Sequence, residues 1–363
     1  MKLQVTQENL SKALNTVARV ASTRGTLPIL GNVLIKTTNN RLSIAATNLD
    51  IAITQYCGAK VAEEGSITIP ARLMQDFISS LPSDVIDLKL EDNKLHITTD
   101  QYNSVINGVS AEDFPVMPAI EDGTELVVPG SALKRALQQV VFAASNDEAR
   151  PVLTGIYVHT ENGSVHFAAT DSYRLAAKTL TKSTADINLL IPVSAMQDVL
   201  RIVSDFTDSV QIVYNDQQVL FRVGDVELVA RLIEGKYPPY QNLIPKDFAN
   251  TAKVKRADLL NITKVSSLFA RESAGSVKVA IDGKAKTLSI RSIASQVGEN
   301  TASAPGEITG DGEITVNSRY LLDALHAFSG DEVEFCFNGK LEPVVLRSTE
   351  EKDYTHLIMP LKS

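Results

Sequence analysis

Apolar residues recur at the 3.6-residue spacing of amphipathic helices in six windows, residues 6–21, 70–81, 130–145, 192–204, 256–271 and 317–328. Between these windows apolar and polar positions alternate, as in strands with one buried face, over residues 33–44, 86–98, 155–168, 210–223, 277–290 and 333–346. Each alternating run is centred on a turn pair: Asn39-Asn40, Asp92-Asn93, Asn162-Gly163, Asn215-Asp216, Asp282-Gly283 and Asn338-Gly339. The last pair is a strong hairpin signal. The pattern predicts an α+β chain with helices packed on antiparallel sheets.

The same elements recur in register along the chain. Leu10, Leu133 and Leu259 hold equivalent places in three similar helical segments, 123 and 126 residues apart. A second helix, beginning near residues 70, 192 and 317, repeats at offsets of 122 and 125. A predicted exit strand ends in proline three times, at Phe114-Pro115, Tyr237-Pro238 and Met359-Pro360. The sequence therefore predicts three copies of one domain, over residues 1–120, 128–245 and 246–363, with linkers at 118–128 and 244–253.

Composition places the chain among soluble globular proteins. It has 363 residues, of which 44% are hydrophobic and 21% are charged, and no run approaches the roughly 18 apolar residues of a membrane span. The first eight residues lack the apolar core of a signal peptide. Cys57 and Cys336 are too few and too far apart for a disulfide framework or a metal site, so we interpret them as small buried hydrophobes. We expect a cytoplasmic protein with no membrane association.

The residues that carry enzyme chemistry are not assembled in any recognisable motif. There is no glycine-rich phosphate loop, and Gly310-Asp311-Gly312 is predicted to be a turn. No histidine has a second ligand four residues on, which argues against zinc, and no serine sits in a nucleophile elbow. The acidic pairs Glu63-Glu64 and Glu350-Glu351 lie in polar stretches typical of solvated surface. We predict no catalytic residue, no metal and no cofactor.

Charge is segregated by element type. The six helical windows hold ten basic and five acidic residues, a net charge of +5, so the whole-chain charge of −8 leaves −13 for the remainder. One explanation is that Lys and Arg are good helix formers, but Glu is equally good and is nearly absent from the windows. The other is that the helices share a surface that faces a polyanion. Such a surface predicts weak, sequence-independent DNA binding.

Four segments, together with the repeat, carry a resemblance to a known family: LPILGNVL at 27–34, ATDSYRLA at 169–176, YPPY at 237–240 and MPLK at 359–362. In order and spacing they resemble the bacterial sliding clamps, the β subunits of DNA polymerase III, over the whole chain. The resemblance implies a head-to-tail homodimer that closes a six-domain ring around duplex DNA. It implies a noncatalytic processivity subunit of the polymerase III holoenzyme, a DNA-directed DNA polymerase, found in the cytoplasm and on the nucleoid during replication.

The resemblance also implies which residues act. For DNA we favour Arg24, Arg72 and Arg201, followed by Lys12, Lys134, Arg135 and Arg256. One dimer edge would be the strand around Ser104 and Ile106. The opposing edge would include Leu268, Phe269 and the strand 276–279, with Val277.

A hydrophobic groove between the second and third domains is implied as the site that takes short motifs from the polymerase, the clamp loader and repair proteins. Its residues by position are Leu153, Thr170, Tyr173, Arg174, Leu175, Pro238, Leu243, Val345, Met359, Pro360 and Leu361, with Arg150, Arg174 and Lys362 for the peptide's polar groups. Aliphatic, proline and methionine side chains suit Leu or Phe anchors. Many members have Gly-His where this chain has Ser172-Tyr173, Arg in place of Lys362, and a basic residue in place of Asn242. The peptide preference is therefore left open.

Two other classes of function remain as alternatives. A hydrolase built on a repeated α+β scaffold would need converging titratable groups, which the sequence does not indicate. A repeat scaffold that binds only proteins would not need the positive charge concentrated in the helices.

Overall fold

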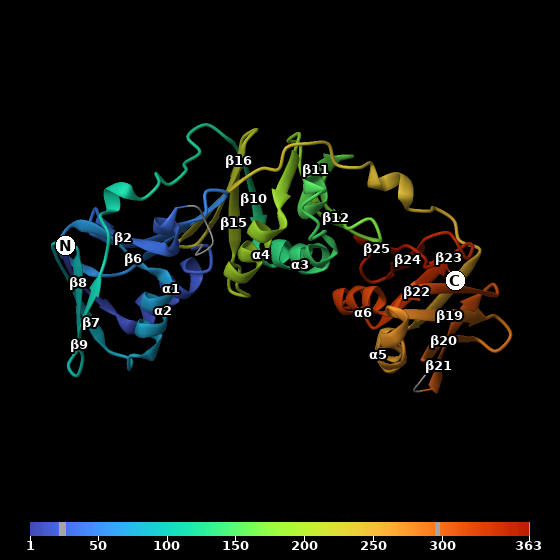
Figure 1. Ribbon diagram of the computed structural model, residues 1–363. Helices are drawn as coiled ribbons and strands as arrows, with labels where there is room; N and C mark the ends of the chain where they lie inside the picture. The colour runs from blue at the N-terminus through green and yellow to red at the C-terminus, as the bar shows by residue number, and fades with distance from the viewer. Residues whose placement is uncertain (22–26, 295–297, 363) are drawn as a thin grey trace. The chain divides into compact units, whose positions relative to one another are not determined.

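The computed structural model describes residues 1–21, 27–294 and 298–362 (Figure 1). Within them, one α-helix lies in each of the six predicted windows: α1 (Gln7–Val17), α2 (Ala71–Ser80), α3 (Gly130–Val140), α4 (Val193–Ile202), α5 (Arg256–Phe269) and α6 (Ser318–Ala327). No helix of this part of the chain is long and apolar enough to cross a membrane.

The strands repeat in the same order around each pair of helices. The first set is β1 (Lys2–Thr6), β2 (Asn32–Thr38), β3 (Arg41–Thr47), β4 (Ile51–Cys57), β5 (Lys60–Glu63), β6 (Gly65–Pro70), β7 (Val85–Glu91), β8 (Lys94–Thr98) and β9 (Asn103–Asn107). The second is β10 (Thr124–Pro129), β11 (Gly155–Glu161), β12 (Ser164–Thr170), β13 (Arg174–Lys182), β14 (Asn188–Pro192), β15 (Ser209–Tyr214), β16 (Gln218–Val223) and β17 (Val226–Arg231). The third is β18 (Asn250–Lys255), β19 (Ser276–Asp282), β20 (Thr287–Ala294), β21 (Gly298–Thr309), β22 (Gly312–Asn317), β23 (Glu332–Phe337), β24 (Val344–Arg347) and β25 (Tyr354–Ile358).

Each helix buries one apolar face against a sheet and leaves its charges in water. In α1, Leu10, Leu14 and Val17 are completely buried, whereas Lys12 on the other face is exposed. The Thr6 hydroxyl accepts a hydrogen bond from the Asn9 N–H (3.3 Å) and caps the first turn. The apolar spacing of this window therefore gives an amphipathic helix with one buried face, as predicted.

Three of the predicted turn pairs form two-residue hairpins. Asn39 and Asn40 have φ values of 52° and 57°, and Asn162 and Gly163 have 50° and 72°, the left-handed backbone that such turns require. The third joins β7 to β8 through Asp92-Asn93. The pairs at 215–216 and 338–339 instead lie in longer loops, and Asp282 ends β19, so that only Gly283 lies in the loop before β20.

The hairpin predicted at Asn338-Gly339 forms, because β23 and β24 pair antiparallel, but its loop is longer than a two-residue turn. The chain runs from Phe337 to Val344 before the ladder resumes, and Cys336 then pairs with Val345. The Asn338 side chain is bound elsewhere: it accepts from the Ala249 N–H (2.7 Å) and donates to the Asp247 carbonyl (3.0 Å). Asn338 thus anchors the segment before β18 instead of closing a two-residue turn.

The chain forms two compact units. Unit 1 comprises residues 1–131 and 198–232, and unit 2 comprises residues 132–197 and 233–363. Unit 1 holds a five-stranded sheet, β5-β1-β7-β8-β9, and an eight-stranded sheet, β10-β15-β16-β17-β4-β3-β2-β6. Unit 2 holds a twelve-strand order, β14-β11-β12-β13-β25-β24-β23-β18-β21-β20-β19-β22. In each unit a strand of one repeat pairs with a strand of the next, β17 with β4 and β13 with β25.

The sheet edges differ in part from the prediction. β9 ends the five-stranded sheet, as expected for the strand around Ser104. The strand 276–279 is not an edge, because β19 lies between β20 and β22 and Val277 is buried. The order ends at β22, and β21 also has an unpaired side over residues 298–305, which pair with β20 alone, whereas residues 306–309 pair with β18.

The segments between repeats also differ from the prediction. The predicted linkers at 118–128 and 244–253 extend into β10 and β18. Phe114-Pro115 and Tyr237-Pro238 do not end strands but lie in irregular chain, and only Met359-Pro360 directly follows a strand, β25. The aromatic-proline pairs at 114–115 and 237–238 therefore mark a repeated connecting segment and not a repeated exit strand.

A polar network in unit 2 fixes α3 to the chain that follows α6. The Glu351 carboxylate accepts from Arg135 Nη2 (2.6 Å), from Gln139 Nε2 (3.3 Å) and from both the N–H and the hydroxyl of Ser329 (2.9 Å each). Arg135 also donates to the Ala327 carbonyl (2.8 Å). Burial alone would raise the pKa of Glu351, but the hydrogen bonds from Arg135 and Ser329 outweigh it, so the pKa is lowered. The carboxylate is therefore held ionised.

Replacing Glu351 by Gln should destabilise unit 2. The substitution removes the charge that partners a largely buried guanidinium, so we expect a loss of about 1–3 kcal/mol, reduced from the fully buried case by the partial exposure of Arg135. The loss should be full at neutral pH and should shrink as the pH falls through the lowered pKa of Glu351, because the wild type then loses the same charge. Urea denaturation at pH 7 and at pH 3 measures both values.

Arg72→Met is the matched control, since it removes an exposed arginine from α2. Its urea midpoint should stay within experimental error of the wild type. Equal midpoints for Glu351→Gln and wild type at pH 7 would show that the network contributes nothing.

Candidate functional site

Three predicted DNA contacts lie exposed on helices of unit 1. Lys12 and Arg201 line one groove of about 500 Å³ that runs between α1 and the last residues of α4, and Arg19 lines it as well. Arg72 is exposed in the first turn of α2. Arg201 Nη1 lies 2.7 Å from Asp198 Oδ1 but remains half exposed, at 52%. The groove thus presents cationic side chains to solvent, which is the chemistry that binds phosphates.

The predicted DNA contacts on unit 2 are placed differently. Arg135 is committed to the Glu351 network, and Arg256 donates to the backbone carbonyls of Gly330 (2.8 Å) and Leu325 (3.4 Å). Both guanidinium groups therefore serve the fold. Lys134 is half-buried on α3. Arg24 lies outside the described residues.

A tight turn between β12 and β13 organises the predicted peptide site. Asp171 Oδ1 accepts from the N–H groups of Tyr173 (2.9 Å) and Arg174 (3.0 Å). The Thr170 hydroxyl donates to the Arg174 carbonyl (2.6 Å) and accepts from the Ser172 N–H (3.1 Å). Ser172 has a φ of 80°, in the left-handed region that favours glycine. The turn holds Tyr173 outward, 59% exposed.

Arg174 has a structural role that the sequence did not indicate. Its guanidinium donates to Asp171 (3.0 Å), to Asp323 on α6 (2.6 Å) and to the Phe142 carbonyl (2.6 Å). It lies over the rings of Tyr320 (4.6 Å to the centroid) and Phe142 (5.4 Å), and its side chain is only 13% exposed. The structure places Arg174 beneath the turn, where it fixes the turn to α6. Its contact with a peptide stays a prediction.

The predicted apolar residues separate into a buried layer and an exposed layer. Leu153, Leu175 and Val345 belong to a buried cluster with Tyr237 and Tyr240, and the half-buried Met359 packs against it. Thr170, in the turn above, is also buried. Pro238, Tyr173 and Leu243 are exposed, while Pro360 and Leu361 are half-buried. The C-terminal segment is held at the turn because the Met359 N–H donates to the Tyr173 carbonyl (2.8 Å).

The polar residues predicted around this site lie at its surface. Arg150 donates from Nη1 to the Ser172 hydroxyl (2.9 Å) and from Nε to Asp147 (2.8 Å), and it is exposed. Lys362 and Asn242 are exposed as well. Arg150 is therefore attached to the turn through Ser172.

Exposed apolar side chains mark both predicted dimer edges. On unit 1, Val105 of β9 is 50% exposed, whereas Ile106 points into the core and Ser104 is intermediate. On unit 2, Leu268 is 53% exposed near the end of α5, and Phe269 beside it is half-buried.

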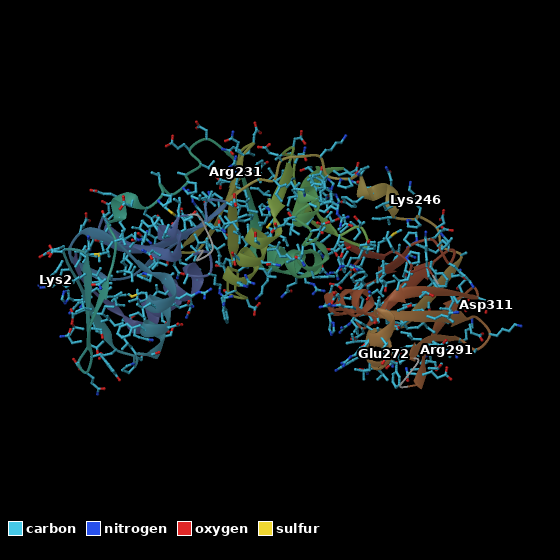
Figure 2. All side chains as sticks on the ribbon, in the orientation of Figure 1. Lys2, Arg231, Lys246, Glu272, Arg291 and Asp311 are labelled. Atoms are coloured by element: carbon cyan, nitrogen blue, oxygen red, sulfur yellow. The ribbon has the colours of Figure 1, made fainter. Side chains whose placement is uncertain are left out.

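Sequence reasoning missed Ile293, which lies at the end of β20 and is 55% exposed. Figure 2 labels Glu272 and Arg291 in the same repeat, and Arg291 binds Glu299 of β21 (2.6 Å). Apolar and charged groups thus occur together beside the free half of β21.

The described residues offer no assembled catalytic chemistry. Among them, no three His, Cys, Asp or Glu side chains are grouped so as to hold a metal ion. Burial raises the pKa of both thiols, Cys57 and Cys336, to about 11, so both are protonated and weakly nucleophilic at neutral pH. Burial lowers the pKa of His356 to about 3, which keeps it neutral beside Tyr354.

Several residues that support the predicted peptide site were not identified from the sequence. The supports of Arg174, namely Phe142, Tyr320 and Asp323, come from a helix end and a helix that no local motif links to the turn. Tyr240 could have been identified from the sequence, because it ends the YPPY segment that begins at Tyr237 and that carries part of the family resemblance. Its hydroxyl lies 2.9 Å from His159 Nε2, beneath the connecting chain.

Comparison with known proteins covers the whole chain. Models of the N-terminal, central and C-terminal domains of the DNA polymerase III β subunit match residues 1–118, 127–239 and 241–362. The beta sliding clamp of Synechocystis is 33% identical over 100% of this chain and 99% of its own length. That of Bacillus subtilis is 29% identical over 100% of both chains.

Solved structures agree with the sequence relatives. The DNA polymerase sliding clamp from Bacillus subtilis superposes with a TM-score of 0.95 at 28% identity, covering 100% of this chain and 99% of the other. The sliding clamp from Bartonella birtlesii, solved bound to griselimycin, superposes with a TM-score of 0.95 at 27% identity over 100% of both chains. With three repeats in order, six helices in the described residues and antiparallel sheets that join neighbouring repeats, this chain belongs to the family of bacterial sliding clamps, the noncatalytic β subunits of DNA polymerase III.

Proposed function

We propose that two copies of this chain close into a ring that encircles duplex DNA and tethers the replicative polymerase. The observation that carries the proposal is strand pairing between repeats. β17 pairs antiparallel with β4, and β13 pairs antiparallel with β25. β4 and β13 hold equivalent places in the first and second repeats, because they begin 123 residues apart, and the same is true of β9 and β17. β21 holds the place of β4 and β13 in the third repeat. Of these strands, β9 and β21 lack a pairing with another repeat. Antiparallel pairing of β9 with β21 of a second copy, at both ends, completes the series and satisfies both edges.

The interior charge of such a ring supports sliding. Lys12, Arg72 and Arg201 lie exposed on helices, and Arg24 joins them as a prediction. Each phosphate contact is individually modest and screened by salt, so the ring would hold DNA by topology and let it slide. An acidic chain with a net charge of −8 is compatible with this role because tight binding is not required.

The peptide site would recruit the polymerase, the clamp loader and repair proteins. Exposed Tyr173 and Leu243 lie over a buried apolar cluster, and Met359 lies between the two layers. This arrangement suits Leu or Phe anchors of a short peptide. Arg150 and Lys362 would bind the peptide's polar groups. Arg174 would position the turn.

Substituting both Val105 and Leu268 by Asp should produce a monomer. The two carboxylates would replace apolar side chains at the proposed interface and would have to be desolvated on association. Light scattering at micromolar concentration should give half the mass of the wild-type protein. Leu341→Asp places the same charge on a loop residue that is 73% exposed and should leave the dimer intact. A wild-type monomer would contradict the proposed ring.

Reversing the charge of Lys12, Arg72 and Arg201 to Glu should weaken equilibrium binding to duplex DNA. The logarithmic salt dependence should become shallower by about 0.9 for each lost phosphate contact. Fluorescence anisotropy over a range of salt concentrations measures the slope. The control triple variant, Lys60→Glu, Lys94→Glu and Lys246→Glu, changes net charge equally at exposed positions outside the helices. Equal effects of the two triple variants would mean that only net charge matters.

The double variant Tyr173→Ala and Leu243→Ala should lose affinity for a fluorescein-labelled pentapeptide that ends in Leu-Phe. Each truncation of an apolar anchor contact costs about 1–2 kcal/mol, so anisotropy should report at least a tenfold weaker Kd. Val265→Ala, which trims an exposed apolar residue of α5, is the control. Unchanged binding by the double variant would place the peptide elsewhere.

A further inference from the structure

The first and second repeats differ in the side chains that lie between the sheet and the connecting chain that follows its last strand. β2 and β11 begin 123 residues apart, as do β3 and β12, and β4 and β13. The connecting chain keeps this offset, because Phe114-Pro115 corresponds to Tyr237-Pro238. Both connectors return over one face of their own sheet: Phe114 and Tyr237 are 7% and 6% exposed. The two places can therefore be compared residue by residue.

In the second repeat this place is filled by aromatic rings. Tyr157 stacks on His159 (4.5 Å between centroids) and on Tyr237 (4.9 Å), and His159 stacks on His166 (5.4 Å). Tyr240 meets His159 edge-on at 5.8 Å, and its hydroxyl hydrogen-bonds to that ring. These contacts fix the connector to the sheet.

In the first repeat the equivalent positions carry side chains that leave a groove between the sheet and the connecting chain. Tyr157, His159, His166 and Tyr240 correspond to Leu34, Lys36, Ser43 and Met117. A groove of about 680 Å³ is left between the sheet and residues 114–117. We call it the connector groove; Leu34, Lys36, Ser43 and Tyr56 line it from the sheet, and Phe114 and Met117 from the connector. Its volume is that of a ligand site.

The floor of the connector groove is an ordered row across three strands. Lys36 pairs with Ser43, and Ser43 pairs with Tyr56, so their side chains lie on one face of the sheet. The equivalent row of the second repeat, His159, His166 and Thr179, supports the stacked rings. A ligand's aromatic side chain on the Lys36–Ser43–Tyr56 row would occupy the place that the protein's own aromatic rings occupy in the second repeat.

The cation left for a ligand is Lys36. Arg41, the other cation of the groove, lies 4.8 Å from the Tyr56 ring centroid and is bound to Asp225 (3.0 Å). Within the described residues, no carboxylate lies within ion-pairing distance of Lys36, which is exposed. Burial and the nearby Glu227 carboxylate raise the pKa of Tyr56, but Glu227 is bound to Arg222 (2.9 Å). Another acid beside the groove, Glu64, accepts from the Asn40 N–H (3.4 Å). The groove therefore favours an anion beside an aromatic group.

We propose that the connector groove binds an acidic peptide segment of a partner protein, with an aromatic side chain on the Lys36–Ser43–Tyr56 row and a carboxylate on Lys36. An extended segment suits a groove open along the strands, and Val116, 94% exposed at its rim, adds apolar contact. This site is separate from the peptide site of unit 2 and shares no residue with it.

The chain has no tryptophan, so a tryptophan in a peptide reports binding directly. The probe is the N-acetylated, C-amidated peptide Asp-Asp-Trp-Ser-Asp, titrated with the full-length protein at low salt. We expect a saturable blue shift of the indole emission with a Kd of roughly 10–100 μM, as for short peptides in a single groove. The absence of a saturable shift would overturn the proposal.

Two variants locate the binding. Lys36→Glu, at an exposed position, should weaken the Kd at least fivefold, whereas Lys94→Glu, an equal charge change on β8, should not. The quadruple variant Leu34→Tyr, Lys36→His, Ser43→His and Met117→Tyr imports the second repeat's rings and should abolish the shift. Equal weakening by Lys36→Glu and Lys94→Glu, or no weakening by either, would overturn the proposal.

A competition separates this site from the one on unit 2. An excess of the unlabelled pentapeptide that ends in Leu-Phe should not displace the acidic peptide. Displacement would place both peptides in one site and would overturn the proposal, while leaving the proposed function intact.

Discussion

The structure depends on antiparallel pairing between strands of neighbouring repeats, which joins their sheets. Each repeat is an open set of strands, and its outermost backbone N–H and C=O groups would remain unpaired if it folded alone. The chain solves this twice by pairing strands of consecutive repeats, β17 with β4 and β13 with β25. In the proposed ring, β9 and β21 would form a third pairing of this kind with a second copy. Association of two copies would then use the same interaction that joins the repeats.

The sequence was informative wherever a single physical cause determined the outcome. Helical spacing of apolar residues located all six helices, because burial of one face is what stabilises a helix against a sheet. Asn39-Asn40 and Asn162-Gly163 gave two-residue hairpins because their left-handed backbone is a local requirement. Asn338-Gly339 has the same local preference, but its side chain binds Ala249 and Asp247, about ninety residues earlier. A competing long-range contact of this kind has no local signal.

The candidate site shows a similar limit. Arg72, Arg135 and Arg256 are alike as helical arginines in the sequence, yet only Arg72 is exposed. Arg135 and Arg256 are taken by carbonyls and a carboxylate that the fold brings together. Arg174 was predicted to contact a peptide, and the structure adds that it binds Asp171, Asp323 and the Phe142 carbonyl. Residue type predicts the chemistry of a cation, whereas the partners that use this chemistry come from elements distant in the chain.

Repetition followed by divergence explains why the two connectors differ. At a shared offset of 123 residues, one repeat carries Tyr157, His159 and His166, and the other carries Leu34, Lys36 and Ser43. The first set buries its own connector through stacked rings, a contribution of about 0.5–1.5 kcal/mol for each ring pair beyond the area buried. The second set forgoes this contribution and leaves the sheet face open. A domain already stabilised by its own sheets can afford such an opening, and an open face with a free cation is available to bind another chain.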